Sequence, residues 1–176
     1  LVSSNLTGNC SFIVVPAPGV DAGTMLLETL HIIECIAPGH LGAAQHMPPA
    51  VVRSLVTLDG SDLASRVAFR RWDNRHDIDK ETTNSILTQQ EPEIRQLIRH
   101  AEATAEKKFS PIRETALDDM TTKLDDEIRR LKALADVNPN VRPEEIDFML
   151  ARKTALSAAI RQSQIRLDAV RLILVA

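Results

Sequence analysis

The sequence predicts an α+β protein, in which an N-terminal antiparallel sheet is joined by the C-terminal strand and carries a long antiparallel helical hairpin. Three observations lead to this prediction. Short apolar runs separated by Pro and Gly turns fill residues 1–76, which is typical of strands. From residue 94 onward apolar residues recur every three or four positions, as in long amphipathic helices. The last five residues are all apolar, so we expect them to be buried as a strand.

The N-terminal region is expected to form strands and turns around four apolar runs: SFIVVPA, TMLLETLHIIECIA, VVRSLVTL and LASRVAFRRW. The turn residues between them are PGVDAG, PGHLGAAQHMPPA and DGSD. Residues 25–37 are ambiguous, because Leu and Met favour a helix whereas the length and flanks of the run also fit a strand. We favour the strand.

This choice decides a candidate metal site, whose members would be Glu28, His31, Glu34 and Cys35. On a helix, Glu28, His31 and Glu34 would share one face, whereas on a strand successive side chains alternate. The strand therefore separates the carboxylates from His31 and Cys35, and we expect no metal site. His40 and His46, in the following loop, would have to fold back to contribute.

Two further patterns have ordinary structural interpretations. Asp73, Asp77 and Asp79 lack the glycine and terminal glutamate of a calcium loop, so a solvated linker is expected. Cys10 and Cys35 are the only cysteines, and we expect reduced thiols although they are enough for one disulfide.

The second part is expected to be helical. A short helix over about 78–90 precedes Pro92, which suits a helix start. The long helix that follows contains Pro111, which should bend it without changing the phase of its apolar stripe. The stripe consists of Leu97, Ile98, Ala101, Ala105, Phe109, Ile112, Ala116, Leu117, Met120, Leu124, Ile128, Leu131 and Ala135.

The stretch VNPNVRPEEID is expected to end this helix and begin another. Asn138 suits a left-handed helix end, and Pro143 with Glu144 suits a first helical turn. A connection this short makes the two helices antiparallel neighbours. We therefore expect strands over 1–76, a helical hairpin over 77–168 and a returning strand over 169–176, which together form a single module.

Composition excludes several classes of protein. With 176 residues and 44% hydrophobic residues, the chain can bury a core of its own. A formal net charge of -3 gives no general attraction to nucleic acids, and no apolar run approaches the roughly 20 residues that cross a bilayer. No signal segment opens the chain, so we expect a cytoplasmic protein, and the start at Leu1 indicates a piece of a longer one.

Three stretches of the sequence resemble a known family. The stretch ALADVNPNVRPEEID, followed by RLDAVRLILVA, closely resembles the C-terminal region of the RapA (HepA) family of bacterial RNA-polymerase-associated ATPases of the Swi/Snf type. Upstream, AGTMLLETLHIIECIAPGHLGAAQHMPPAVVRSLVTLDGSDLA resembles the preceding strand segment of that region. The resemblance extends from about residue 21 to the end and is strongest in the last forty or so residues.

The resemblance implies a C-terminal module of a factor that binds RNA polymerase and uses ATP hydrolysis to release stalled polymerase for reuse. It implies that ATP and magnesium are bound by helicase-like lobes upstream in the full-length protein. These lobes would be a second partner of this module, and the full-length protein would bind DNA. This chain has no glycine-rich loop followed by Lys and Ser or Thr, and no Asp-Glu box on a strand. We therefore assign it no catalytic, cofactor or metal residue, no enzymatic activity and no membrane partner.

One basic stretch is a candidate partner contact, and its residues are Arg66, Arg70, Arg71, Trp72 and Arg75. Arg and Trp are enriched at interface hot spots, so this patch is expected to dock on RNA polymerase or on the ATPase lobes. Alternatively, Trp72 belongs to the core and the arginines are merely solvated. A different function would be to grip nucleic-acid phosphates, against which the nearby Asp59, Asp62 and Asp73 and the scarcity of aromatic residues count. A third possibility is a free-standing helical-hairpin scaffold.

Overall fold

The computed structural model describes the backbone of residues 2–4, 8–17, 19–72, 76–77 and 80–176, and the side chains of residues 10–17, 19–70 and 81–176. The chain forms two compact units, each assembled from separate stretches of sequence. Unit 1 comprises Leu1–Ile32, Val51–Lys108 and Ile165–Ala176, and unit 2 comprises Ile33–Ala50 and Phe109–Gln164.

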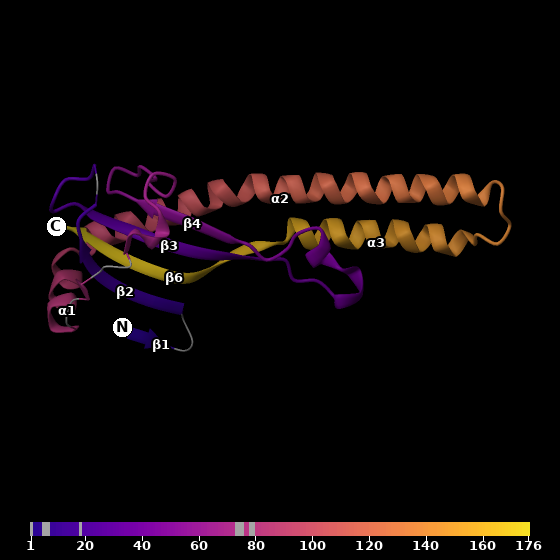
Figure 1. Cartoon of the computed structure of the whole chain (residues 1–176). Coiled ribbons are helices and arrows are strands. Elements are labelled where there is room, and N and C mark those ends of the chain that lie inside the picture. Colours follow the sequence, from indigo (N-terminus) through magenta and orange to yellow (C-terminus); the bar gives the residue numbers. More distant parts are fainter. Residues whose placement is uncertain (1, 5–7, 18, 73–75, 78–79) are drawn as a thin grey trace. The chain divides into compact units, whose positions relative to one another are not determined.

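Unit 1 is built on a sheet with the strand order β1-β2-β6-β3-β4, and β5 pairs with the free part of β2 (Figure 1). The strands are β1 (Val2–Ser4), β2 (Gly8–Val15), β3 (Met25–Glu34), β4 (Val51–Val56), β5 (His76–Asp77) and β6 (Gln164–Val175). Residues 25–34 thus form the favoured strand, and the C-terminal strand enters the sheet between β2 and β3. The α+β class is confirmed.

The sheet is mixed and not wholly antiparallel as predicted. β2 pairs with β6 in parallel, with Ile13 opposite Ile173, whereas β3 and β4 are antiparallel. The end of β6 lies beside the start of β3, where the Val175 N–H donates to the Thr24 carbonyl at 2.9 Å. A parallel pair needs a long connection, and residues 16–163 between β2 and β6 supply it.

The apolar tail is buried on both faces of this sheet. On one face Ile173 and Val175 join a core with Ile13, Leu26 and Leu55. On the other face Leu172 joins a second core, whose other buried members are Phe12, Met25, Leu27, Val56, Leu97 and Ala101. Leu97 and Ala101 come from the helix that covers this face, so the tail is the central strand of a two-sided core, as predicted.

The return helix is shorter, and the last strand longer, than the sequence predicted. The helix ends at Arg161 and the strand begins at Gln164, not at residue 169. Residues 166–170 alternate in a way that fits a helix or a strand over so few positions. Pairing with β2, which sets Ala169 opposite Asn9, supplies the backbone partners that decide for the strand.

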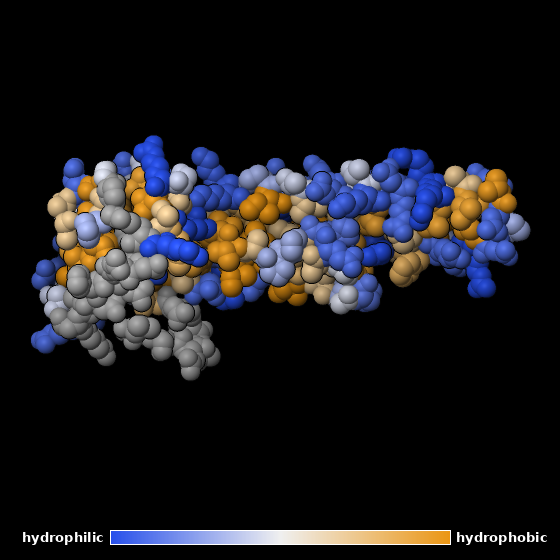
Figure 2. Space-filling view, in the orientation of Figure 1, coloured by the Kyte–Doolittle hydropathy of each residue, from blue (hydrophilic) through white to orange (hydrophobic). Residues whose placement is uncertain are grey.

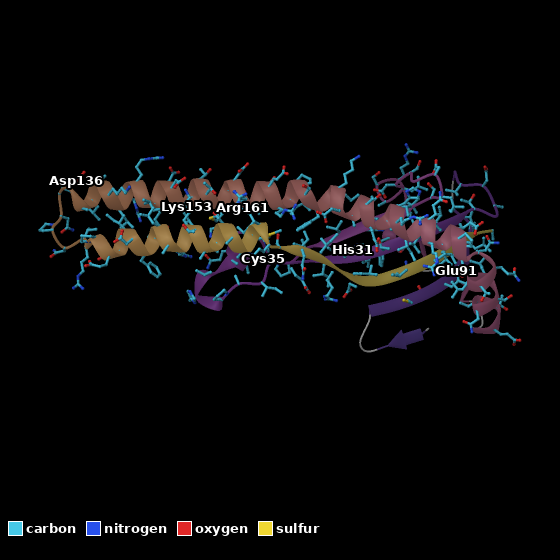
Figure 3. The ribbon with its side chains drawn as sticks, turned by 180° about the vertical axis from the view of Figure 1, so that it is seen from behind. His31, Cys35, Glu91, Asp136, Lys153 and Arg161 are labelled. Carbon is cyan, nitrogen blue, oxygen red and sulfur yellow. The ribbon has the colours of Figure 1, made fainter. Side chains whose placement is uncertain are left out.

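Unit 2 contains the helical hairpin, in which α2 (Glu91–Ala135), from Phe109 onward, lies beside α3 (Pro143–Arg161) (Figure 1). A shorter helix, α1 (Lys80–Gln89), precedes α2 in the chain. In the hairpin, Lys153 projects from α3 toward α2 and binds Asp125 at 2.5 Å (Figure 3). Asp126 binds Arg129 at 2.8 Å on the exposed face.

The apolar stripe of α2 is narrower than predicted. Ile98 and Ile112 are 41% and 42% exposed, so they do not belong to it. The buried residues are Leu97, Ala101, Ala105, Phe109, Ala116, Met120, Leu124 and Ile128. The helix continues through Pro111 as one element, in keeping with the phase of this stripe.

The turn between the helices differs from the prediction at Asn138. No described residue other than glycine has a positive φ, so Asn138 does not adopt the left-handed conformation. Its side-chain oxygen instead accepts the N–H of Asn140 at 3.0 Å, which closes the turn through the side chain. The helix α3 begins at Pro143 with Glu144 and Glu145 in its first turn, as predicted.

Three short 3-10 helices complete the fold: η1 (Gly39–Leu41), η2 (Ala43–Gln45) and η3 (Phe69–Trp72). In unit 2, η1 and η2 pack on α3, and Arg152 donates to the Leu41 carbonyl at 3.3 Å. In unit 1, the run LASRVAFRRW forms turns and η3 rather than a strand. No helix in the described part of the chain has the length and apolar content needed to cross a membrane.

Candidate interaction surface

The residues of the metal-site hypothesis are separated, as the strand interpretation predicted. Glu28 and His31 lie on opposite faces of β3 and are both buried. Burial lowers the pKa of His31, although Glu102 opposes this effect. Burial, with Lys123 and Arg152 nearby, also lowers the pKa of His46. Among the described residues no group of three potential ligands comes together, and the aspartate side chains at 73, 77 and 79 lie outside them.

The two cysteines are free thiols. Cys10 is exposed, whereas Cys35 is half-buried, and this burial raises the pKa of the Cys35 thiol. A raised pKa lowers the fraction of reactive thiolate at neutral pH. Burial therefore makes the Cys35 thiol less reactive.

A charged cluster occupies one face of the sheet in unit 1. The carboxylate of Glu28, whose side chain is 2% exposed, binds Arg53 and Arg171, each at 2.7 Å. Arg53 also donates to the carbonyls of Ala64 at 2.9 Å and Val67 at 2.6 Å. These charge-assisted contacts fix both guanidinium groups in place.

The position of this cluster follows from the two-residue period of strands. Each of the three neighbouring strands β6, β3 and β4 sets a charged residue two positions from a core residue, and hence on the same face. The pairs of core and charged residue are Leu26 and Glu28, Leu55 and Arg53, and Ile173 and Arg171. On this face of the sheet, the apolar core is therefore followed by a charged residue two positions away on each of the three strands.

Phe69 stacks over the two arginines. The Phe69 ring centre lies 5.8 Å from the guanidinium carbon of Arg53 and 5.1 Å from that of Arg171. Such cation–π contacts contribute about 0.5 to 2 kcal/mol each. Phe69 is 43% exposed, so its ring contacts the two arginines and is still partly open to solvent.

Asp62 holds the segment that carries Phe69. Its carboxylate accepts the N–H groups of Leu55 and Ala64 at 3.1 and 3.0 Å and binds Lys108 at 2.5 Å. Although burial opposes it, hydrogen bonding to Lys108 and to these two N–H groups holds the pKa of Asp62 below its usual value. Asp62 is therefore a structural anchor of this segment.

The candidate contact residues lie on and beside this segment. Arg66 and Arg70 are exposed in the same stretch as Phe69. Arg71 and Trp72 have a described backbone in η3, but their side chains, and all of Arg75, lie outside the described residues. We call Phe69, Arg66 and Arg70, with Arg53 and Arg171 beneath the ring, the Phe69 surface.

Sequence reasoning missed Phe69, Arg53 and Arg171. A signal for the arginines was present, since each interrupts an otherwise apolar strand, in VVRSLV and VRLILV. A charged residue on a strand that is buried on both faces needs a buried partner. The identity of that partner, Glu28 on a third strand, depends on the strand order and is not visible in the sequence.

Comparison with known proteins agrees with the resemblance seen in the sequence. Residues 1–175 match the family model described as RNA polymerase recycling family C-terminal. The chain belongs to this family. It is similar to the RNA polymerase-associated proteins RapA of Yersinia pestis (strain Pestoides F) and Yersinia pseudotuberculosis serotype O:1b (strain IP 31758). The identity is 31% over 176 residues in both, which is 99% of this chain and 18% of each relative.

The coverage defines what part of such a protein this chain represents. The chain corresponds to the C-terminal domain of the family and spans 18% of the length of these relatives. The similarity therefore concerns this C-terminal region and not the rest of those relatives.

Proposed function

We propose that this chain is a non-catalytic regulatory and interaction module of an ATP-dependent factor that recycles RNA polymerase. The family description and the relatives' names support RNA polymerase as the partner. Under this proposal, ATP, magnesium and DNA are handled by helicase-like lobes elsewhere in the full-length protein, which this module also contacts. The factor acts in the cytoplasm.

The observation that carries the proposal is the Phe69 surface. Its half-exposed ring rests on the guanidinium groups of Arg53 and Arg171, whose side chains are 16% and 17% exposed, and exposed Arg66 and Arg70 adjoin it in sequence. A rigid aromatic residue with neighbouring arginines is the composition typical of interface hot spots. Because Glu28 and the strands fix Arg53 and Arg171, little side-chain entropy is lost when the ring is covered.

Charge reversal at the rim of this surface tests the proposal. In the full-length protein, Arg66→Glu combined with Arg70→Glu should weaken binding to purified RNA polymerase at least tenfold. Arg99→Glu combined with Lys107→Glu makes the same change in charge at exposed positions of α2 and should leave binding unchanged. Phe69→Ala and Trp72→Ala would show whether the aromatic residues share in the contact. Equal binding by both charge-reversal variants would contradict the proposal.

Salt separates a protein contact from a grip on nucleic-acid phosphates. Raising salt from about 0.1 to about 1 M shortens the Debye length from about 10 to about 3 Å, which weakens exposed charge contacts but not apolar burial. We expect polymerase binding to keep a salt-resistant part that is lost in Phe69→Ala. Binding that falls log-linearly with salt, and that a short duplex DNA competes away, would instead identify the surface as a nucleic-acid contact.

A further inference from the structure

The end of the helical hairpin, formed by the turn and the adjoining parts of α2 and α3, carries several exposed apolar side chains. Val137 and Phe148 are 79% and 60% exposed, and Leu134 and Leu150 are 44% and 41% exposed. Figure 2 shows apolar residues gathered at the end of the hairpin. Turns that connect helices are usually polar, and neighbouring exposed apolar residues mark interaction sites. This end of the hairpin therefore has a surface that its own unit leaves uncovered.

An open pocket of about 590 Å³ lies within this surface. Both helices and the turn contribute to it, and its lining residues are Leu131, Asn140, Arg142, Glu144, Glu145, Phe148 and Met149. Met149 is buried and Phe148 is exposed, so the pocket has an apolar base and an apolar wall. Leu134 lies one turn beyond Leu131 on the same face of α2 and extends the apolar area.

The end of the hairpin that holds the pocket carries more acidic than basic side chains. Glu144 and Glu145 line the pocket together with Arg142. Over residues 132–147 as a whole, the exposed carboxylates of Asp136, Glu144, Glu145 and Asp147 outnumber the exposed cations of Lys132 and Arg142. Figure 3 shows Asp136 at the outer end of the hairpin. The backbone N–H of Arg142 donates to a carboxylate oxygen of Glu145 at 3.4 Å, so Glu145 caps the start of α3. The carboxylate of Glu144 remains available to a partner.

We propose that this hairpin end is a second docking surface and binds a protein segment that presents an apolar side chain flanked by basic residues. The apolar side chain fills the pocket beside Phe148, and the basic neighbours pair with Glu144, Asp147 and Asp136. Charge complementarity favours this occupant over an acidic segment or a nucleic acid, which the same carboxylates repel. The site is independent of the Phe69 surface, which lies in unit 1 and has the opposite charge.

The experiment measures binding of two fluorescently labelled helical peptides to the full-length protein by anisotropy. The peptides share a leucine and phenylalanine face, and one carries flanking lysines where the other carries glutamates. The lysine peptide should bind. Phe148→Ser and Glu144→Lys should each weaken its binding at least tenfold. Ile112→Ser, which removes an equally apolar side chain elsewhere on the hairpin, should not change it.

Several outcomes would overturn the inference. They are no binding of the lysine peptide, equal affinity for both peptides, or equal effects of Phe148→Ser and Ile112→Ser. A dimer in analytical ultracentrifugation that Phe148→Ser abolishes would overturn it too, because a second copy would then be the occupant. The variant with Arg66→Glu and Arg70→Glu should keep peptide binding, so failure of this inference and failure of the polymerase contact are distinguished.

Discussion

Glu28 is the residue on which the charged cluster of unit 1 depends. Two arginines from neighbouring strands bind its carboxylate, and both also contact the Phe69 ring. Without the carboxylate, two guanidinium groups would lie close together with no charge between them. Removing one partner of a buried ion network usually costs more than the network contributes as a whole.

We therefore expect Glu28→Gln to lower the free energy of unfolding by about 3 to 5 kcal/mol. Glu91→Gln is the matched control, because Glu91 pairs with Arg95 at 2.6 Å on an exposed helix face. The control should cost no more than about 1 kcal/mol. Urea unfolding followed by circular dichroism measures both values. Similar losses of unfolding free energy in the two variants would show that the buried cluster contributes no more to stability than an exposed ion pair.

The last strand, β6, is the element that joins the start and end of the chain. Its C-terminal half pairs with β2 and contributes to both cores, whereas its N-terminal half is largely exposed. Burial therefore changes along a single strand from solvent-facing to fully enclosed. Because of this gradient, the effect of removing a buried and an exposed apolar side chain on stability can be compared within one strand.

Ile173→Ala should destabilise the protein by about 2 to 5 kcal/mol, because Ile173 is 0% exposed and its removal leaves a cavity between two strands. Leu167→Ala, at a position 43% exposed in the same strand, should cost less than about 1 kcal/mol. Thermal unfolding gives both shifts. The assigned register would be wrong if Leu167→Ala proved the more damaging substitution.

At the scale of the whole molecule, the two units are interleaved in sequence. Four chain crossings connect them, at residues 32–33, 50–51, 108–109 and 164–165. Three crossings fall inside continuous elements, namely β3, α2 and the start of β6. Unfolding of one unit would have to break these elements, which favours a single cooperative transition for the module.

We predict one thermal transition that core substitutions in either unit lower. Met120→Ala removes a fully buried side chain of unit 2, and Ile173→Ala one of unit 1. Each should shift the whole calorimetric peak. Two peaks, of which Met120→Ala moves one and Ile173→Ala the other, would mean that the units unfold independently.

The parts of the fold that depend on local pattern were predictable from the sequence. The period of the apolar residues gave the long helix, the proline and acidic residues gave the start of α3, and the apolar tail gave a buried final strand. The prediction was wrong at residues 166–170, where the helix and strand patterns fit equally well over a few residues. It was also wrong at Asn138, where a side-chain hydrogen bond closes the turn and no left-handed backbone conformation is adopted.

The candidate surfaces were predictable only in part. The arginines around Trp72 were visible as a basic stretch, but the ring that stacks on Arg53 and Arg171 was Phe69. The hairpin pocket was not predicted, because a single apolar residue outside the stripe, such as Leu134, is common on a helix surface. Which apolar residues remain exposed depends on how far along the hairpin the two helices bury their side chains against each other.

The sequence by itself determined the α+β class, the long helices of the hairpin, the family and the need to bury the last strand, because each of these follows from local periodicity or from recognisable motifs. Only the tertiary structure decided the mixed strand order, the pairing of Glu28 with Arg53 and Arg171, and the uncovered end of the hairpin. These features join residues that are distant in the chain, and their partners are set by strand neighbours and packing, which no local pattern encodes.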